Sequence, residues 1–343
     1  MKHAFRRAPS SFLIGSVLAV ALFVFSGSGT SGSSAVASVS GSKVISVALL
    51  LPCATNDMTW CQQAYVAAAR LQREGLIKLR YIADAPQDDA GISRVMSQYA
   101  AQGSQFIIAH SAWSTATINI AKRFPKVDFA YAGGGSTVTN VATYGEPIYQ
   151  AAYVAGMAAA GISKSGVVGG VAGQDIPLCH AELAAFQAGA RRIRHHAGAL
   201  SAYVGNWNDP APSEQSILAQ ADHHADVFIA CGDGPAKGMI AAIKSRHLSG
   251  FAYVGTMFPL APHNLAGSII YNLYPYFKAM VRDVANGTFH GKTYNIGMGQ
   301  GGVALRLNPQ YSMGKIPAGV RQQMRQVQRQ IAAGTFQVPY ITH

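Results

Sequence analysis

The sequence is poor in charged residues, in cysteine and in long apolar runs. Only 12% of its residues are charged, and 15 acidic residues face 27 Lys and Arg. Beyond the first 37 residues, no apolar run reaches the roughly 20 residues that a membrane-spanning helix needs. Because 49% of the 343 residues are hydrophobic, the chain can bury large cores. This composition excludes an intrinsically disordered protein and fits two lobes of ordinary size.

The motifs of several common chemistries are also missing. The sequence has no GxSxG nucleophile elbow and no Walker loop, and its GxGxxG match at 297–302 precedes a strand-like segment rather than a helix. It has no CxxC, and the histidine pairs at 195–196 and 223–224 have no acid or cysteine spaced to complete a metal site. We therefore expect neither a metal nor a cofactor.

The excess of positive charge does not indicate a nucleic-acid partner. The formal net charge is +12, and removing residues 1–37 takes away three positive residues and no acid, which leaves +9. The positive residues are scattered, and the densest group, Arg191, Arg192 and Arg194, has no aromatic platform beside it. Nucleic-acid sites combine a basic stripe with such a platform, so we expect no nucleic acid among the partners.

The first residues have the features of an export signal. A positive segment at 2–7 precedes the apolar stretch Phe12–Phe25, and small residues at 35–37 form a cleavage site, with 26–28 as a competing site. No cysteine lies near either site, so the lipid anchor of a lipoprotein is not expected. We predict a signal peptide over 1–37, a periplasmic or extracytoplasmic location and a peripheral relation to the membrane. Retention as an uncleaved anchor stays open.

Four cysteines follow the signal. They are the disulfide candidates Cys53, Cys61, Cys179 and Cys231. An even number in an oxidising compartment permits two disulfides, and Cys53 with Cys61 is the first pair we expect. The alternative is a thiol-dependent enzyme, in which Cys61 at a helix start is a nucleophile with His110 or His180 as its partner.

Apolar runs alternate with amphipathic stretches along the whole chain. The pattern predicts strands over 44–51, 78–83, 105–110, 127–134, 166–173, 199–205, 226–232 and 251–256, with helices between them. Continuous apolar strands separated by helices indicate parallel sheets covered on both faces. The fold class is α/β, with two lobes in series and a ligand cleft between them. A last helix over 317–331 is expected to dock on an apolar face and to expose a basic one.

The loops at the carboxyl ends of these strands carry the candidate site. All three tryptophans fall there: Trp60, Trp113 and Trp207. Ligands in such sheets bind at these ends, and aromatic rings stack on flat ligands. The positions therefore favour a small planar ligand, with Asp233 and Asp175 in neighbouring loops as candidate polar contacts. Packing of the tryptophans in the core is the alternative.

Several stretches, in this order, resemble one family. They are "TNVATYG" (139–145), "AYVAGMAAAGISKSGVVGGVAGQDIP" (152–177), "WNDP" (207–210), "HHADV" (223–227), "NLYPYF" with "VANGTF" (272–289), and "NP" with "IAAGTF" (308–336). Together they resemble the basic-membrane-protein family, the purine-nucleoside-receptor-like substrate-binding proteins of ABC importers.

The resemblance implies a type I periplasmic binding fold whose two lobes are joined by three crossings. The N-terminal lobe would hold 44–145 plus about 252–283, and the C-terminal lobe 146–251 plus about 284–340. The family captures a small molecule by lobe closure, without chemistry, and delivers it to an ABC permease with its ATPase. We therefore predict a solute-binding protein and not an enzyme. A periplasmic ligand-binding sensor for a membrane receptor is the alternative on the same fold.

The resemblance also implies site residues. Trp60 stands where the family has its first-helix aromatic, Cys61 replaces the amide that follows it, and Asp233 matches a pocket Asp of one branch. Gly133 and Thr256 stand where nucleoside binders have acids, and Asn272 completes the candidate set. Ribose hydroxyls would lose strong acceptors at those positions. Within the class of purine nucleobases and nucleoside-like molecules, a free base or another less hydroxylated heterocycle is favoured.

Overall fold

Two six-stranded sheets organise residues 43–343, the part of the chain that this computed structural model describes. The first sheet has the strand order β11-β5-β4-β3-β1-β2, and the second has the order β12-β10-β9-β8-β6-β7. Every pairing is parallel except β10 with β12. The two parallel α/β lobes expected from the sequence are thus confirmed, whereas the predicted signal peptide lies outside the described residues.

The strands are short, as is usual for covered parallel sheets. Those of the first sheet are β1 (Ile45–Leu50), β2 (Ile77–Ile82), β3 (Phe106–Ala109), β4 (Asp128–Ala132), β5 (Val141–Tyr144) and β11 (Thr293–Tyr294). Those of the second are β6 (Val167–Ala172), β7 (Gly198–Tyr203), β8 (Val227–Cys231), β9 (Ser249–Ala252), β10 (Leu265–Tyr271) and β12 (Val303–Leu307). Strands β3 and β8 are buried along their whole length, because helices cover both faces.

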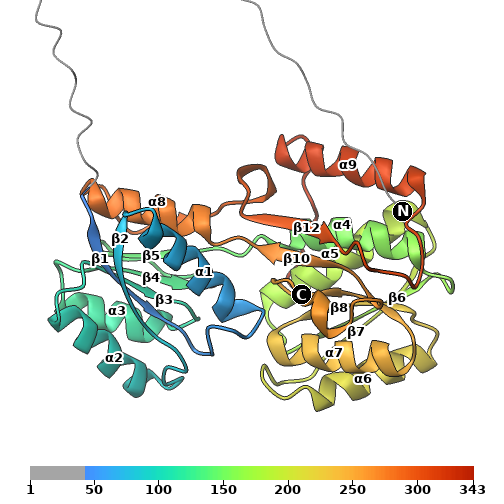
Figure 1. Cartoon of the computed structure of the whole chain (residues 1–343), viewed down its shortest axis with the longest axis horizontal. Helices are drawn as coiled ribbons and strands as arrows, with labels where there is room; N and C mark the ends of the chain where they lie inside the picture. Colours follow the sequence, from blue (N-terminus) through green and yellow to red (C-terminus); the bar gives the residue numbers. More distant parts are fainter. Residues whose placement is uncertain (1–42) are drawn as a thin grey trace, which may run out of the picture. The chain divides into compact units, whose positions relative to one another are not determined.

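The helices lie between consecutive strands, except the last one, which follows β12. They are α1 (Trp60–Arg73), α2 (Asp89–Ala101), α3 (Ser114–Arg123), α4 (Ile148–Ile162), α5 (Pro177–Ile193), α6 (Ala211–Asp222), α7 (Asp233–Ser245), α8 (Tyr274–Ala285) and α9 (Ala318–Ala332), with short 3-10 turns η1 (Phe258–Leu260) and η2 (Met298–Gln300). Around the first sheet, α2 and α3 lie on one face, and α1 and α8 lie on the other (Figure 1). No helix among residues 43–343 has the length and apolarity to cross a bilayer.

Side chains along the strands of the first sheet point alternately into two hydrophobic cores, one on each face of the sheet. Leu50 and Ile107 point toward α2 and α3, whereas Leu49 and Phe106 point toward the α1 face. Successive residues of a strand face opposite sides of a sheet, so one step along the chain moves a side chain from one core to the other. The same alternation determines which tryptophans can lie on one face of the sheet.

In the second lobe, α4 and α5 pack with their backbones in contact. A side-chain Cβ at Gly156 would collide with the Phe186 carbonyl, and one at Gly189 would collide with the Tyr153 carbonyl. The alanine-rich α4 is buried nearly all round for the same reason. The last helix, α9, buries Val320 and its helical partners and exposes its arginines, as the sequence predicted.

The chain crosses between the lobes three times, after β5, after β10 and after β11. Strand pairing divides the chain differently from the boundaries expected above. The segment 252–283 was expected in the first lobe, but β10 pairs with β9 and β12 in the second sheet. The segment from 284 was expected in the second lobe, but β11 pairs with β5 in the first. Apolar periodicity identifies a strand without specifying which sheet it joins.

Candidate functional site

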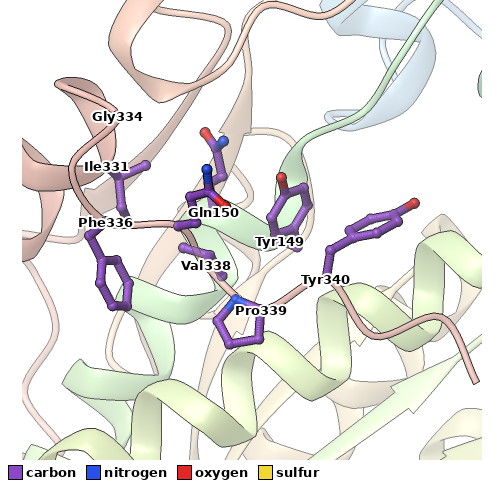
Figure 2. Close-up of a pocket in the computed structure, with 9 residues that line it drawn as sticks. Tyr149, Gln150, Ile331, Gly334, Phe336, Val338, Pro339 and Tyr340 are labelled. Carbon is purple, nitrogen blue, oxygen red and sulfur yellow. The ribbon is translucent and has the colours of Figure 1, made fainter.

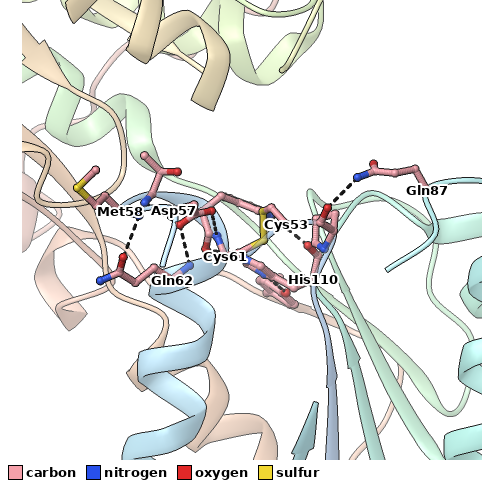
Figure 3. Close-up of a disulfide and its surroundings, with 11 residues drawn as sticks. Cys53, Asp57, Met58, Cys61, Gln62, Gln87 and His110 are labelled. Carbon is pink, nitrogen blue, oxygen red and sulfur yellow. Dashed lines mark hydrogen bonds between the residues drawn. A yellow bond between two sulfur atoms is a disulfide. The ribbon is translucent and has the colours of Figure 1, made fainter. Parts of the chain in front are cut away.

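A tight, crosslinked turn leads from β1 into α1. The Asp57 carboxylate accepts hydrogen bonds from the backbone N–H groups of Thr59 (2.9 Å), Cys61 (2.9 Å) and Gln62 (3.0 Å), which satisfies free donors at the start of the helix. A disulfide between Cys53 and Cys61 closes the turn (Figure 3). The predicted pairing is confirmed, and Cys179 pairs with Cys231. This turn fixes the position of the first residue of α1.

The second disulfide removes the remaining thiols. No cysteine in the described chain is free, so the thiol-dependent enzyme has no nucleophile. Cys61 was also expected to face the ligand, but its sulfur is fully buried in the disulfide. Cys53, Asp57 and Cys61 could bring metal-ligating atoms within 4.8 Å of one another. The two sulfurs are bonded together, and the carboxylate already accepts three N–H groups, so this group is not a metal site.

Trp60, the first residue of α1, is held by His110 at the end of β3. The two rings stack with centroids 4.2 Å apart and planes 14° apart, and the indole Nε1–H donates to the His110 carbonyl at 3.1 Å. Tyr271, at the end of β10, lies nearly parallel to Trp60 with its centroid 5.8 Å away. Trp60 is only partly buried and has a fixed orientation. It is therefore placed as an aromatic wall where the lobes meet.

His110 has one tautomer in this arrangement. Its Nε2 lies 3.1 Å from the Trp60 carbonyl and must donate, whereas its Nδ1 accepts from the Tyr144 hydroxyl at 2.7 Å. Burial lowers the pKa of His110 to about 3, so the ring is neutral. His110 was considered from the sequence only as a partner for a cysteine nucleophile. The structure assigns it to positioning Trp60.

Trp113 does not join Trp60. It is 5% exposed and packs in the core between the first sheet and helices α2 and α3. Trp60 packs on the opposite face of the same sheet. Trp113 was expected to contact the ligand, but the alternation of the sheet turns it into the core, which was the alternative interpretation.

Trp207 lies across the carboxyl ends of two strands of the second sheet. A Cβ at Gly232 would be 2.7 Å from the indole, and one at Gly173 would also collide with it, so both glycines are needed for this ring position. The Trp207 carbonyl accepts the Gly234 N–H at 2.8 Å. The residue is 36% exposed. Trp207 is therefore beside Asp233, at the end of the lobe where a ligand was expected from the sequence.

Asp233 begins α7 in the second lobe and faces the first turn of α1 in the first lobe. Burial raises the pKa of its carboxyl to about 6, although the nearby Thr59 hydroxyl and Trp60 N–H lower it. Its Oδ1 and the Thr59 hydroxyl are buried atoms without a hydrogen-bond partner in the part of the chain described. A Cβ at Gly255 would collide with the Met58 carbonyl, so the lobes are in close contact here.

Two acids near this contact were missed by the sequence analysis. Glu146 follows β5 at the first crossing, and burial raises the pKa of its carboxyl to about 8. Glu182 on α5 is fully buried, and neither of its carboxylate oxygens has a partner among residues 43–343. Burial, with the neighbouring Glu146, raises its pKa well above the ordinary value. For Glu182 the sequence did contain a signal of burial, namely a single glutamate on the apolar face of a predicted helix.

Tyr253 connects the three acids. Burial and the charges of Glu146, Glu182 and Asp233 all raise the pKa of its hydroxyl. The neighbouring Tyr271 donates its hydroxyl to the Gly145 carbonyl at 3.0 Å, next to Glu146. The contact between the lobes thus combines an aromatic ring with acids that form no ion pair in the described part of the chain.

The other four predicted residues have different surroundings. Gly133 has a φ of +96°, and a Cβ there would be 3.8 Å from Glu146 Oε1, so its backbone borders the acids. Asp175 is exposed and pairs with His180. Thr256 is exposed in the loop after β9. Asn272 donates its side-chain amide to the Gly301 carbonyl at 2.8 Å, which ties two crossings together.

A pocket of about 530 Å³ lies elsewhere, between the start of α4 and the segment after α9 (Figure 2). Its lining residues are Tyr149, Gln150, Ile331, Gly334, Phe336, Gln337, Val338, Pro339 and Tyr340. No predicted site residue lines it, and none of the buried unpaired polar atoms found within residues 43–343 belongs to these residues. Trp60 and Asp233 lie instead where the two lobes are in contact.

Comparison with known proteins agrees with this architecture. Residues 44–339 match the Bmp family, described as "ABC transporter substrate-binding protein PnrA-like". A purine-binding protein of Brucella abortus is 26% identical over 64% of this chain, and the match spans 62% of that relative's length. The transcriptional activator protein med of Bacillus subtilis is 20% identical over 77% of this chain and 82% of its own.

Solved structures share the fold. A solute-binding protein from Conexibacter woesei has a TM-score of 0.74 at 20% identity, covering 88% of this chain and 100% of its own. A transcriptional activator of the comK gene from Bacillus halodurans has a TM-score of 0.72 at 22% identity, covering 85% of this chain and 99% of its own. The fold is that of the type I periplasmic binding proteins, as expected.

Proposed function

Because this chain belongs to the basic-membrane-protein family of PnrA-like ABC substrate-binding proteins, we propose that it is an exported solute-binding protein for a small planar ligand. The ligand is a purine nucleobase or a nucleoside-like heterocycle, and its receivers are an ABC permease and ATPase. The similarity to a purine-binding protein supports this ligand class. The predicted export signal supports a periplasmic or extracytoplasmic location.

The observation that carries the proposal is the position of Trp60. Its ring is fixed by His110 and lies nearly parallel to Tyr271, where residues of both lobes meet. Beside the Trp60 ring, the Thr59 hydroxyl and the Asp233 carboxyl lie near each other but come from different lobes, and neither the hydroxyl nor Asp233 Oδ1 has a well-formed hydrogen bond among residues 43–343. A flat ligand would stack on the ring while its polar edge satisfied both atoms.

Capture follows from contacts on two lobes. A ligand that binds both the α1 turn and the α7 turn stabilises the closed arrangement more than the open one, so closure becomes favourable only when it is present. Each buried polar atom left unpaired costs about 1–3 kcal/mol. A ligand that pairs them contributes differential affinity for the closed form, which the permease would recognise.

A thermal-shift panel of nucleobases and nucleosides tests the proposal. A ligand at 100 times its dissociation constant adds about 2.7 kcal/mol of stability, which corresponds to a shift of several degrees. Trp60→Ala should abolish the shift, and Trp60→Phe should retain part of it because a ring remains. Tyr81→Ala removes a surface aromatic of the first lobe and is the control, since Tyr81 is 45% exposed on β2. A panel without any stabilising heterocycle would contradict the proposal.

Sensing is the second candidate function. Two relatives of this fold are named as transcriptional activators, at 20% and 22% identity, which favours considering a regulatory role for this chain. Uptake assays separate the two roles. If deletion of this protein abolishes uptake of the stabilising ligand, it is a transport component. Unchanged uptake with altered ligand-dependent gene expression would support a sensor.

A further inference from the structure

Three carboxyls at the contact between the lobes take part in no ion pair within residues 43–343. They belong to Glu146, Glu182 and Asp233, which come from three different segments of the chain. The charges of all three raise the pKa of the Tyr253 hydroxyl. Buried acids are normally paired or hydrogen-bonded, because burial of an unpaired charge is costly. Without a ligand such carboxyls stay neutral by holding a proton, and a bound ligand can supply the missing partner.

Glu182 is the acid that points to a ligand most directly. It is 0% exposed, and both of its carboxylate oxygens are buried and without a hydrogen-bond partner in the described chain. Two free oxygens on one carboxylate can accept two parallel hydrogen bonds from adjacent donors. Asp233 and Thr59 add one unpaired buried atom each at the same contact.

The position of Glu182 is rigid. Cys179 lies one helical turn before it on α5 and is bonded to Cys231, two residues before Asp233, with the two Cα atoms 5.7 Å apart. This disulfide holds the helix carrying Glu182 against the turn carrying Asp233. The carboxylates are thus held in fixed positions, which favours recognition of a ligand edge of defined geometry.

The surrounding groups do not neutralise the acids. The titratable neighbours are Asp57 and Lys237 near Asp233, and Tyr144, Tyr253, Tyr271, Tyr276 and Tyr340 near Glu146. His110 is neutral, and His180 on α5 is occupied by Asp175 and Tyr203. Lys237 is exposed, and among the three acids its charge lowers the pKa of Asp233 alone. When Glu182 is deprotonated, N–H donors for its oxygens can therefore come from a ligand.

A metal ion does not fit this place. Within residues 43–343, these three acids do not bring oxygens within 4.8 Å of one another, as one shared ion would require. An extended organic group can reach carboxylates that are farther apart. The donor it needs for Glu182 is a pair of adjacent N–H groups, as on an amidine or on the edge of a 2-amino-6-oxopurine.

Building on the proposed function, we propose that Glu182 reads two adjacent N–H donors on the ligand, so that the protein selects 2-amino-6-oxopurines of the guanine type. Glu146, which is neutral when it holds its proton, can donate to an acceptor on the same ligand. Burial, with Glu146 nearby, raises the pKa of Glu182 well above its ordinary value. A Glu182 that holds a proton has to release it to accept both N–H groups, so we expect binding to be accompanied by release of a proton.

Titration calorimetry with matched ligands tests this assignment. Guanosine and inosine differ by the 2-amino group alone, as do guanine and hypoxanthine. We expect the amino-bearing member of each pair to bind roughly 10- to 100-fold more tightly, because the other member leaves one Glu182 oxygen unpaired. Equal affinities within each pair would overturn the assignment in the unmodified protein, whatever any variant does.

The variant Glu182→Gln provides the second measurement. It should reduce the preference to within about threefold and remove the proton release seen by comparing two buffers of different ionisation enthalpy. Asp128→Asn is the matched control, since burial raises the pKa of Asp128 to about 6 on β4 of the first sheet, and it should retain both properties. Retention of the full preference in Glu182→Gln would refute the role of Glu182. Binding of inosine and guanosine alike leaves the proposed function standing, whereas failure of every purine overturns both.

Discussion

The two disulfides should stabilise the protein by different amounts, because they close loops of different length. The Cys53–Cys61 bond joins residues 8 apart, and the Cys179–Cys231 bond joins residues 52 apart. Each fixes one half of the site, the α1 turn in the first lobe and the α5–β8 contact in the second. Replacing each pair with alanine tests both contributions separately.

The expected magnitudes follow from loop closure in the unfolded chain. The entropy of closing a loop gives about 2.5 kcal/mol for the loop of 8 residues and about 4 kcal/mol for the loop of 52. Both double variants remove the same atoms, and three of the four sulfurs come from fully buried residues. The difference of about 1.5 kcal/mol therefore reports mainly on loop length.

Urea unfolding followed by circular dichroism and tryptophan fluorescence measures these losses. We expect the variant lacking Cys179–Cys231 to unfold at the lower urea concentration, with the free energy obtained by linear extrapolation. Reduction of the unmodified protein should lower its stability by at least as much as either double variant. The reasoning is refuted if loss of the short loop costs as much as loss of the long one, because the contributions would then come from local packing.

Three further predictions concern single positions. Gly156→Ala should destabilise the protein by about 3 kcal/mol, because the new Cβ collides with a backbone carbonyl of α5. The control is Gly319→Ala on α9, which should be neutral or slightly stabilising in the same melting experiment, since nothing lies within 4 Å of its Cβ position. The ligand-free protein should lose stability as the pH rises from about 4.5 to about 8, because Glu146 binds a proton more tightly in the folded state than in the unfolded state. Glu146 contributes at most about 1.4 kcal/mol per pH unit to this slope, and Glu146→Gln should reduce the slope by up to that amount in urea titrations at several pH values. His110→Phe should cost about 1–3 kcal/mol in the same urea assay, because the Tyr144 hydroxyl loses its acceptor. Each prediction fails if its variant behaves like the unmodified protein. The contradicting results are an unchanged melting temperature for Gly156→Ala, an unchanged slope for Glu146→Gln and an unchanged urea midpoint for His110→Phe.

Strands β1 to β4 and β6 to β9, the helices between them and the first disulfide could be predicted because local patterns determine them, whereas β5, β10 and β11 were not among the predicted strands. Continuous apolar runs indicated covered parallel strands, and the short spacing between Cys53 and Cys61 at a strand-to-helix turn indicated their pairing. The membership of β10 and β11 could not be predicted. Each joins a sheet through backbone hydrogen bonds to strands that the sequence pattern does not specify, because the periodicity of a strand carries no information about its neighbours.

The site was predicted in part for a similar reason. Trp60 and Trp113 both follow strands of the first sheet, yet they pack on opposite faces of it. A shift of one residue reverses the face, so position at a strand end is not sufficient to place a side chain. Glu146 and Glu182 were missed because an acid next to an apolar helix resembles a solvated residue until the packing of α4 against α5 is known.

The most direct test of the central claim is calorimetric titration of the purified protein with purine nucleobases and nucleosides. We expect saturable binding of one ligand per chain, abolished by Trp60→Ala and retained in weakened form by Trp60→Phe, because the ligand stacks on the ring that His110 fixes. If no purine binds, or if a purine binds with unchanged affinity to Trp60→Ala, the contact between the lobes at Trp60 is not the site.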